Sequence, residues 1–518
     1  MPGEDTANPK LIFLTGRAGI GKTMFSIKLV RDWASGSLFP PEEVNKYKFV
    51  FLFFFRQLNE IDEPLSLLDF LSLSHELDAN EFEFICKNPE QTLIVMDGLD
   101  EFKDKDQLGR SGRPGKDKQS IATICARVLN RSVLNGATVV VTSRPESSQQ
   151  IEFDRRAEIL GFKPKDVEEY FKRFFGDKVE EANLVLGHVK ENANVAGLCY
   201  VPVNCFIICR YFQWYLQNRD SSTEEYKLPS TITELYQGIL KMFTLKHHKH
   251  YKGQKFSDTP DVTFLLGELS RLSFELLQAK KYVFNQNDLR NVMGEEGVTK
   301  VLESGIIHCI PGCSTGPFSV ETKYCFIHLT FQEFLAALYL VRIKNDDIIQ
   351  KTIEQDLDIV IQFVSGLLKT ASPSDKSLEL LSFIVEKLII EKSDLLLAIK
   401  CMFEFGIPSF AEQVVQQYDF TDLGLRVNDS DCAALAFLLS LDVKNNHKTK
   451  HLDLSMSSIT FVGLRYVMDA LKKPNCCIEF LKLGVNNIGA EGAKYVSEAL
   501  SSGHCTLQSL DVSYNNIG

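Results

Sequence analysis

The feature that most constrains the fold of this chain is the octapeptide at residues 16–23, which reads GRAGIGKT. It directly follows the apolar run at residues 11–14 and precedes a helix-like stretch at residues 24–30. Glycines at this spacing let backbone N–H groups turn toward phosphates, and the next helix adds the positive end of its dipole. The pattern therefore predicts a phosphate-binding loop between a buried strand and a helix. A glycine-rich turn without nucleotide is the alternative.

The loop also supplies two side chains with distinct roles. Lys22 is the positive charge expected to reach the β- and γ-phosphates, and the Thr23 hydroxyl is expected to bind Mg²⁺. We predict that nucleotide contacts come from the whole loop and the residue after it: Gly16, Arg17, Ala18, Gly19, Ile20, Gly21, Lys22, Thr23 and Met24.

The second half of the expected site lies at residues 93–101, which read LIVMDGLDE. Four apolar residues without alternation are typical of a parallel strand that is covered on both faces. Asp97 then falls at the carboxyl end of this strand, where open α/β sheets bind ligands, and its carboxylate could hold Mg²⁺. Asp100 and Glu101 follow at a distance that lets one of them polarise a water. The alternative for either of these two is a surface acidic turn.

Three more segments read as strands of the same sheet. Residues 48–55, KFVFLFFF, suit a central strand, and residues 137–142, ATVVVT, form another apolar run. The latter is followed by Ser-Arg-Pro, which carries Arg144 to the same sheet edge as Lys22 and Asp97, where its guanidinium could sense a γ-phosphate. An arginine that merely ends a strand is the alternative. Residues 158–162 are expected to add a short closing strand.

These motifs together resemble the NACHT nucleotide-binding domain of the NOD-like receptor family, within the signal-transduction ATPases with numerous domains. The specific marks are the loop GRAGIGKT, the acidic motif DGLDE and TSRP at residues 142–145. A fourth mark, YCFIHLTFQEFLAA at residues 324–337, is similar to the family's winged-helix motif. The resemblance implies that His328 contacts the β-phosphate of ADP and that Pro202 packs on the adenine. A core histidine and a proline that only starts a helix are the alternatives.

A repeat closes the chain. The triplets LDL, LKL and LDV at residues 452–454, 481–483 and 510–512 recur every 29 residues, as do Gly463 with Gly492 and Asn487 with Asn516. This period predicts leucine-rich repeats, each with a strand, an asparagine that satisfies the turn backbone, and a helix. The third unit stops at Gly518, so we expect the chain to be incomplete at this end. Only fifteen residues precede Gly16, so we expect an effector domain either to have been trimmed from this chain or to be supplied by a partner protein.

The predicted fold class is an α/β P-loop NTPase with a parallel sheet, followed by a helical domain, a winged helix, a second helical domain and the start of an α/β leucine-rich-repeat solenoid. The expected boundaries are residues 1–160 for the NACHT domain, 161–222 for the first helical domain, 223–342 for the winged helix, 343–440 for the second helical domain and 441–518 for the repeats.

Composition indicates in which cellular compartment the protein lies and which binding partners it lacks. The thirteen cysteines are scattered and odd in number, and no signal peptide precedes the first strand, which favours reduced thiols in the cytoplasm. No apolar run approaches the length of about 18 residues that spans a bilayer. A net charge of −11 argues against DNA binding. The spacing of Cys309, Cys313, Cys325 and His328 could be read as a zinc site, although buried core thiols explain it more simply.

The expected function is an ATP/ADP-controlled switch that senses a ligand. ADP would be held between the loop and His328 at rest, and exchange for ATP would open the protein and let copies associate. Asp97 would hold Mg²⁺, Asp100 or Glu101 would orient water, Arg144 would sense the γ-phosphate, and hydrolysis would be slow. The repeats would carry an unknown ligand, and an effector would come from a partner protein. The alternatives are a turnover P-loop ATPase or kinase and a scaffold with a vestigial site.

Overall fold

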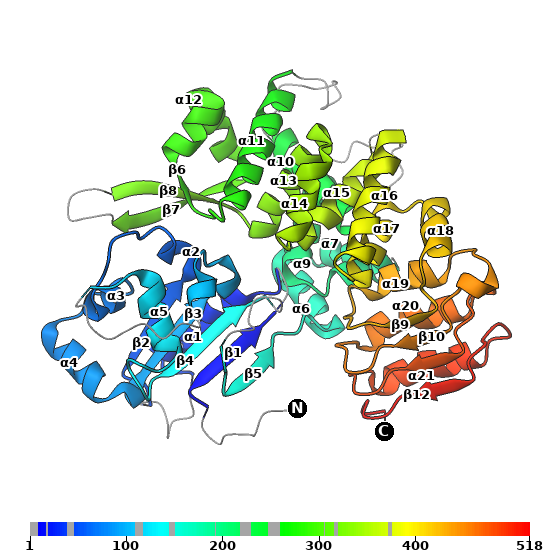
Figure 1. The fold of residues 1–518 in the computed structure, drawn as a ribbon, viewed down its shortest axis with the longest axis horizontal. Coiled ribbons are helices and arrows are strands. Elements are labelled where there is room, and N and C mark those ends of the chain that lie inside the picture. The colour runs from blue at the N-terminus through cyan, green and yellow to red at the C-terminus, as the bar shows by residue number, and fades with distance from the viewer. Residues whose placement is uncertain are drawn as a thin grey trace. The chain divides into compact units, whose positions relative to one another are not determined.

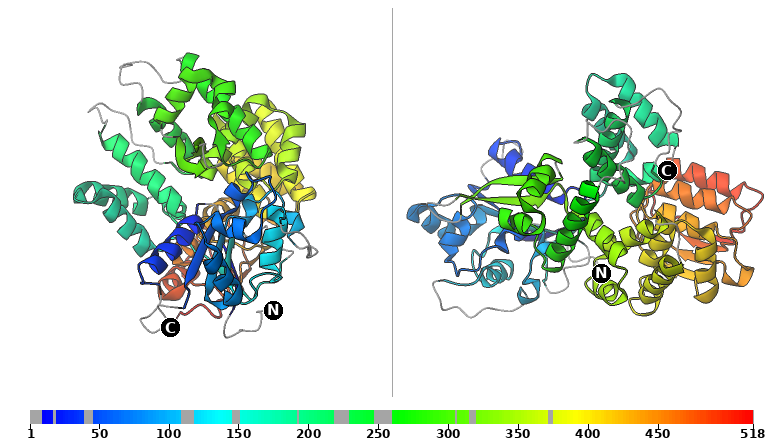
Figure 2. Two further views of the ribbon diagram at one scale, coloured as in Figure 1. Left: turned by 90° about the vertical axis from the view of Figure 1, so that its left-hand side faces the viewer. Right: turned by 90° about the horizontal axis from the view of Figure 1, so that it is seen from above.

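The computed structural model describes residues 9–16, 19–38, 46–108, 118–144, 151–191, 193–217, 229–246, 260–304, 306–314, 320–370 and 375–517. The chain forms two compact units (Figures 1 and 2). The first contains residues 1–160, 275–288 and 308–329, and the second contains residues 161–274, 289–307 and 330–518. Each unit is described separately below.

A five-stranded parallel sheet is the centre of the first unit. Its strands are β1 (Leu11–Thr15), β2 (Phe49–Phe54), β3 (Thr92–Asp97), β4 (Thr138–Ser143) and β5 (Arg155–Glu158). Their order in the sheet is β2-β3-β4-β1-β5. The predicted α/β fold with a parallel sheet is confirmed.

Helices cover both faces of this sheet, which explains the unbroken apolar strands. Leu29, Val30 and Trp33 of α1 (Lys22–Ala34) pack on one face, against Val50, Val95 and neighbouring side chains. On the other face Phe51, Phe53 and Met96 pack with α3 (Leu67–Ser72), α4 (Ala79–Lys87) and α5 (Ile121–Leu129). All six residues of β3 and of β4 are buried. A strand buried on both faces has no polar side to alternate with.

Two strand predictions were wrong. The segment at residues 48–55 does not form a central strand, because β2 is the end of the sheet and pairs only with β3. Its phenylalanines are buried by helices rather than by a second neighbouring strand, so an apolar run could not distinguish the two positions. The closing strand lies at Arg155–Glu158 instead of residues 158–162. All four of its side chains are exposed, as suits a polar edge strand.

A small second sheet belongs to the same unit and combines β6 (Phe284–Asn285), β7 (Ile307–Ser314) and β8 (Val320–Phe326) in the order β6-β8-β7. The hairpin of β7 and β8 lies within residues 223–342, where the sequence predicts a winged helix. Lys323 Nζ of β8 lies 3.8 Å from Glu60 Oε2, which follows the short helix α2 (Phe55–Leu58). This ion pair is mostly buried and joins the hairpin to the domain of the five-stranded sheet.

The second unit is helical up to its last hundred residues. Its first group comprises α6 (Pro164–Phe175), α7 (Val179–Glu191), α8 (Ala193–Leu198) and α9 (Pro202–Gln217). A second comprises α10 (Ile232–Lys246), α11 (Pro260–Gln278), α12 (Gln286–Ser304) and α13 (Leu329–Ile343), parts of which extend into the first unit. A third comprises α14 (Asp346–Glu354), α15 (Asp358–Thr370), α16 (Asp375–Ile390), α17 (Leu395–Phe405) and α18 (Pro408–Gln417). The predicted domain boundaries stay predictions.

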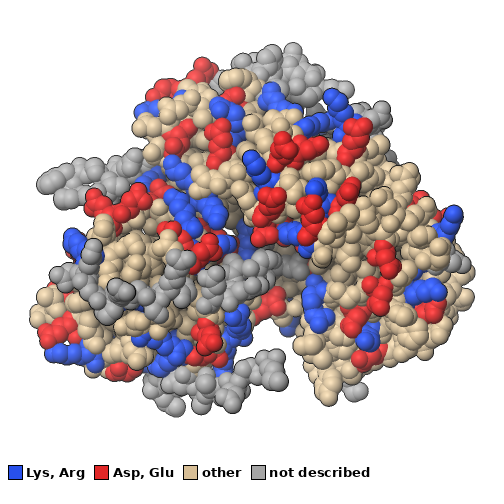
Figure 3. All heavy atoms as spheres, viewed as in Figure 1, with Lys and Arg blue, Asp and Glu red and all other residues tan. Residues whose placement is uncertain are grey.

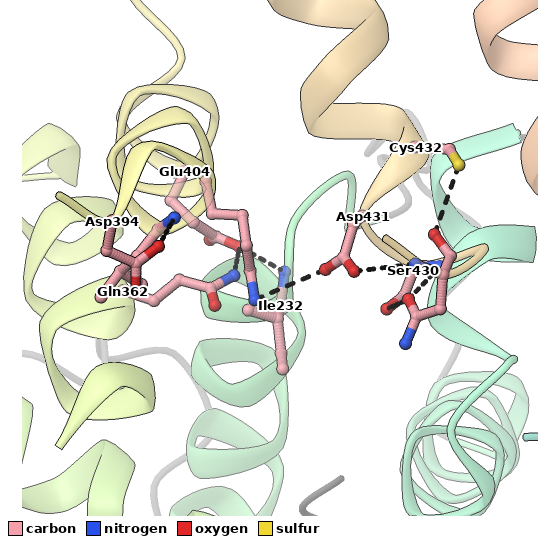
Figure 4. Close-up of polar contacts among 10 residues, drawn as sticks. Ile232, Gln362, Asp394, Glu404, Ser430, Asp431 and Cys432 are labelled. Atoms are coloured by element: carbon pink, nitrogen blue, oxygen red, sulfur yellow. Dashed lines mark hydrogen bonds and ion pairs between the residues drawn. The ribbon is translucent and has the colours of Figure 1, made fainter. Parts of the chain in front are cut away.

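One buried carboxylate ties three of these helices together (Figure 4). Glu404 of α17 accepts hydrogen bonds from the backbone N–H of Thr233 at 3.1 Å and of Ile232 at 3.3 Å, so it caps the start of α10 from outside. Gln362 Nε2 of α15 donates to the same carboxylate at 3.0 Å. The N–H groups of a first helical turn lack partners within the helix. The Glu404 carboxylate supplies hydrogen-bond acceptors for these N–H groups and fixes how α10, α15 and α17 pack.

The repeats form a parallel sheet of β9 (Asp422–Gly424), β10 (His451–Asp453), β11 (Phe480–Lys482) and β12 (Ser509–Asp511). Their helices are α19 (Cys432–Leu439), α20 (Phe461–Leu471) and α21 (Gly489–Leu500), with α20 packed on both others (Figure 2). Strand β9 lies one repeat length before β10, ahead of the expected boundary at residue 441.

The asparagines of the repeat were predicted one position too late. Asn486 Nδ2 donates to Leu454 O and Leu483 O, and Asn515 Nδ2 donates to Leu483 O and Val512 O. These amides, and not those of Asn487 and Asn516, bridge neighbouring turns. In each repeat two asparagines are adjacent, and both recur after 29 residues. The period alone therefore could not show which asparagine of each pair makes these hydrogen bonds.

Among the described residues, no helix is long and apolar enough to cross a bilayer. On the face shown in Figure 3, Lys and Arg are interspersed with Asp and Glu, and neither sign of charge forms a continuous area.

Candidate functional site

The phosphate-binding loop has the backbone that its sequence requires. Gly19 and Gly21 have φ angles of 75° and 103°, in the left-handed region that glycine adopts without strain. Helix α1 begins at Lys22 directly after Gly21, so the first N–H groups of the helix face the loop. A Cβ on Gly16 would lie 2.7 Å from Ile20 Cγ2, so this position has no room for a side chain. Arg17 and Ala18 lie outside the described residues.

Lys22 closes the loop on itself. Its Nζ donates a hydrogen bond to Gly16 O at 2.6 Å. Burial lowers the pKa of this ammonium, and nearby Arg144 lowers it further, while Asp100, Asp97 and Glu101 oppose the shift. A buried ammonium with a depressed pKa gains from an anion placed beside it. The loop is therefore arranged to receive the charge of phosphate groups.

Asp97 accepts three side-chain hydrogen bonds within the site. It lies at the carboxyl end of β3 and is 5% exposed. Its Oδ2 accepts from Thr23 Oγ1 at 2.6 Å, and its Oδ1 accepts from Thr142 Oγ1 at 2.7 Å and from Ser26 Oγ at 2.9 Å. The hydroxyl and carboxylate expected to hold Mg²⁺ are thus in direct contact.

Arg144 and Asp100 form a pair at the same sheet edge. Arg144 Nε lies 3.1 Å from Asp100 Oδ2, and the backbone N–H of Arg144 donates to Asp100 Oδ1 at 3.1 Å. One guanidinium contact and one backbone contact join Arg144 to this carboxylate and hold the side chain beside it. In this structure Asp100 positions Arg144, which leaves Glu101 as the better candidate for orienting water.

Glu101 ends a single turn of 3-10 helix, Leu99–Glu101, that follows Gly98. Its carbonyl accepts from Asn59 Nδ2 at 2.8 Å. Burial raises the pKa of the Glu101 carboxyl to about 8, helped by Asp100 and Asp97 and opposed by Arg56 and Arg144. A carboxyl that titrates near neutral pH is suited to proton transfer, which requires a pKa close to the working pH.

The raised pKa of Glu101 predicts a pH effect on stability without nucleotide. The folded protein titrates this group near 8 and the unfolded chain near 4.5, so the stabilisation is complete below pH 4.5 and is lost as pH rises through 8. Between pH 6 and 8.5 we expect the free energy of unfolding to fall less in Glu101→Gln than in the wild type, measured by urea denaturation. The same variant should bind ATP and fail to hydrolyse it. Equal pH slopes, or hydrolysis at the wild-type rate, would reject this role.

His328 reaches the same site from far along the chain. It follows β8 and belongs to the first unit. Burial lowers the pKa of its imidazole to about 4, and the positive charges of Arg144, Lys22 and Arg56 lower it further. These charges act on His328 only because the fold brings it close to them. At neutral pH the ring is uncharged, and one of its two nitrogens carries a proton to donate.

For two other predicted residues, Met24 and Pro202, the structure gives the position in the fold but no contact with the site. Met24 is 68% exposed on α1. Pro202 is the first residue of α9, the helix start that the sequence predicted, and lies in the second unit. Their contacts to a base and the roles of the other site residues stay predictions.

Three functional candidates were missed by the sequence analysis. Ser26 and Thr142 donate to Asp97, and Thr142 Oγ1 also accepts from the Gly98 N–H at 3.0 Å. Arg56 acts electrostatically on both Glu101 and His328. Arg56 had a signal, because it follows a strand-like run as Arg144 does. Ser26 is one turn after Lys22, where its side chain faces the sheet.

The geometry fits a magnesium–nucleotide complex better than a metal held by protein alone. Among the described residues, no group of three or more His, Cys, Asp or Glu side chains could hold a metal ion. Mg²⁺ typically takes one or two protein ligands and completes its shell with water and phosphate oxygens, which Thr23 and Asp97 would permit. For the zinc alternative, the side chains of Cys309 and Cys313 lie outside the described residues.

A phosphate-binding loop between β1 and α1, with an aspartate at the end of β3 beside the loop threonine, defines a P-loop nucleotide-binding domain. The NACHT domain family matches residues 10–178, and the leucine-rich repeat family matches residues 475–497 and 503–518. This chain belongs to the NACHT and leucine-rich-repeat proteins of the NOD-like receptor type.

Curated relatives agree with this assignment. Protein NLRC5 of Mus musculus is 31% identical over 64% of this chain and 16% of its own length. NACHT, LRR and PYD domains-containing protein 6 of Mus musculus is 30% identical over 72% of this chain and 42% of its own length. The chain thus spans less than half of these relatives. Among solved structures, a signal transduction ATPase with numerous domains from Pyrococcus horikoshii aligns over 95% of this chain and 74% of its own, at 12% identity and a TM-score of 0.29, too low to support an argument about the fold.

Proposed function

We propose that this protein is an ATP/ADP-controlled molecular switch of the innate-immune receptor kind, held at rest with ADP. The observation that carries the proposal is the closeness of His328 to the charges of Lys22 and Arg144, roughly three hundred and two hundred residues away in sequence. A side chain that follows β8 therefore lies within electrostatic range of Lys22 and Arg144. A bound nucleotide would be contacted by both, so its identity can control how firmly they are held together.

Each residue has a distinct part in this proposal. Lys22 would bind the β- and γ-phosphates, and neutral His328 would donate its ring N–H to the β-phosphate. Arg144, directed by Asp100, would contact a γ-phosphate, and Glu101 would accept a proton from water. Thr23 and Asp97 would hold Mg²⁺, which would supply positive charge against the phosphates. Hydrolysis would be slow and would return the switch to its resting form.

The magnitude of the switch shows that His328 cannot act alone. Moving a population from 1:99 to 99:1 requires about 5.5 kcal/mol of differential binding. One hydrogen bond to a charged group contributes about 1.5–3 kcal/mol. Other contacts, such as the Lys323–Glu60 ion pair, must add to it. By likeness to the family, we further propose that the protein self-associates on activation and binds a ligand at its repeats. We also propose that it signals through a partner effector protein and is located in the cytoplasm.

Substituting His328 tests the switch. His328→Ala should weaken ADP binding by about 10- to 150-fold, the loss of one hydrogen bond to a phosphate, and should weaken ATP binding less. Isothermal titration with both nucleotides gives the two affinities. His75→Ala is the control, because His75 is exposed and stacks on Phe51 at 4.7 Å, away from the site.

A lower stability of His328→Ala with an unchanged ratio of ADP to ATP affinity would mean that His328 is only a core residue. A wild-type turnover well above about 1 s⁻¹ would favour the alternative function, a turnover ATPase or kinase.

A further inference from the structure

A pocket of about 210 Å³ lies within the second unit, on the helix side of the repeats. Helices α6, α7 and α8 form one wall, and the repeat helices α20 and α21 form the other. The lining is mostly apolar and includes Phe162, Val167, Leu186, Val189, Phe461 and Val462. Aromatic rings of Tyr200, Tyr466 and Tyr495 add to it. The strands of the repeats do not contribute to this pocket.

Specific contacts hold the two walls in place. The backbone N–H of Gly197 in α8 donates to Tyr466 Oη of α20 at 3.3 Å. A Cβ at Gly197 would lie 3.2 Å from this hydroxyl, so the two helices approach closely because position 197 has no side chain. Asp429 Oδ1, at the pocket edge, accepts from the N–H groups of Thr460 and Gly463 and caps the start of α20. The pocket is therefore formed before a ligand arrives.

Its size and lining suit a compact aromatic molecule. An engineered apolar cavity of about 150 Å³ is large enough to bind benzene, so a pocket of about 210 Å³ with a largely apolar lining has room for one or two rings. Small-molecule sites typically combine an apolar wall with a few polar groups that fix orientation. The aromatic lining here offers ring faces and edges for stacking.

Two cations at the pocket mouth indicate the charge of the ligand. Lys190 Nζ lies 3.6 Å from Glu168 Oε2, and Arg465 Nε lies 3.7 Å from Asp469 Oδ2. Both distances exceed that of a hydrogen bond, whereas Glu168 is hydrogen-bonded to Lys172 at 2.8 Å. Lys190 and Arg465 therefore keep N–H groups that can bind an acidic substituent, while the buried Asp429 carboxylate is already hydrogen-bonded.

We propose that this pocket binds a small aromatic anion, with its rings against Val462 and Phe461 and its acidic group between Lys190 and Arg465. Such a ligand contacts α6–α8 and the repeat helix α20 together. Its binding therefore stabilises the packing of these helices on the repeats. The site is separate from the nucleotide site and does not depend on the switch proposed above.

Fluorescence titration with two probes tests this site. The probes are naphthalene-1-sulfonate, an aromatic anion of two rings, and 1-naphthylamine, its counterpart that is uncharged at neutral pH. Val462→Trp fills the pocket and should lower the affinity for both by at least about tenfold. Ala490→Trp is the matched control, because residue 490 is one repeat after Phe461, exposed on α21 and outside the lining. It should leave both affinities unchanged within about twofold.

The charge arm uses the double variant Lys190→Gln with Arg465→Gln, both at exposed positions. It should weaken sulfonate binding by about fivefold or more and leave the amine unchanged, as expected for loss of ion pairs near the surface. Equal binding by Val462→Trp and Ala490→Trp, or equal losses of both probes in the double variant, would overturn the proposal. If Val462→Trp fails to fold, Ala196→Leu narrows the same pocket from α8 and should likewise lower the affinity for both probes.

Discussion

Lys22→Ala should lower the affinity for ADP and for ATP by about 30- to 4,000-fold, because removing one partner of a buried ion pair costs about 2–5 kcal/mol. The ammonium donates a hydrogen bond to the loop carbonyl Gly16 O, and its burial lowers its pKa. Isothermal titration measures the loss directly. The rise in melting temperature that nucleotide gives the wild type should disappear as well.

The nucleotide-free protein should respond differently. Because burial disfavours the charged form of Lys22, its removal costs little stability when no phosphate is present. Lys28→Ala is the control, since Lys28 lies on the same helix, is 62% exposed and pairs with Asp32. It should leave both nucleotide affinities unchanged. Wild-type ADP affinity in Lys22→Ala would show that the loop does not bind phosphate.

Asp97→Asn should abolish the gain in ATP affinity that Mg²⁺ provides and lower the free energy of unfolding by about 1–3 kcal/mol. The first effect follows from loss of the carboxylate beside Thr23. The second follows because three hydroxyls donate to this carboxylate, and an amide cannot accept from all of them in the same geometry. ATP titrations with Mg²⁺ and with a chelator, combined with urea denaturation, measure the two effects.

Asp154→Asn separates the two effects. Asp154 accepts from the backbone N–H of Lys10 and Leu11 and from Arg131, at the start of β1 and away from the phosphate loop. Its substitution should lower stability and leave the Mg²⁺ dependence of ATP binding intact. If Asp97→Asn kept the wild-type response to Mg²⁺, Asp97 would be a structural residue only.

The elements around the phosphate loop were predictable because short-range rules determine them. A left-handed glycine followed by a helix start needs no tertiary information, and the loop, β3 and β4 appear where the sequence indicates. Asp97 ends β3 and Arg144 directly follows β4, so parallel pairing carries them to one sheet edge. The 29-residue period likewise identified the repeat, since each repeat contacts its neighbours in the same way.

Other features could not be predicted because they depend on which elements pack beside a segment in the fold. An edge strand and a central strand have the same apolar composition when helices cover both faces, so the position of β2 could not be read from its phenylalanines. Strand β5 is polar and exposed, which left no pattern to detect. The choice of Asn486 over Asn487 depends on which amide faces the previous turn.

The sequence by itself determined the chemistry available to this protein: a phosphate loop, an acidic strand end and a leucine-rich repeat, each specified by residues close together in the chain. Only the tertiary structure decided how that chemistry is combined. It placed His328 among the charges of Lys22, Arg144 and Arg56, gave Asp97 three hydroxyl donors, and paired Asp100 with Arg144. Burial and the field of neighbouring charges depend on distances between residues far apart in sequence, which folding alone sets.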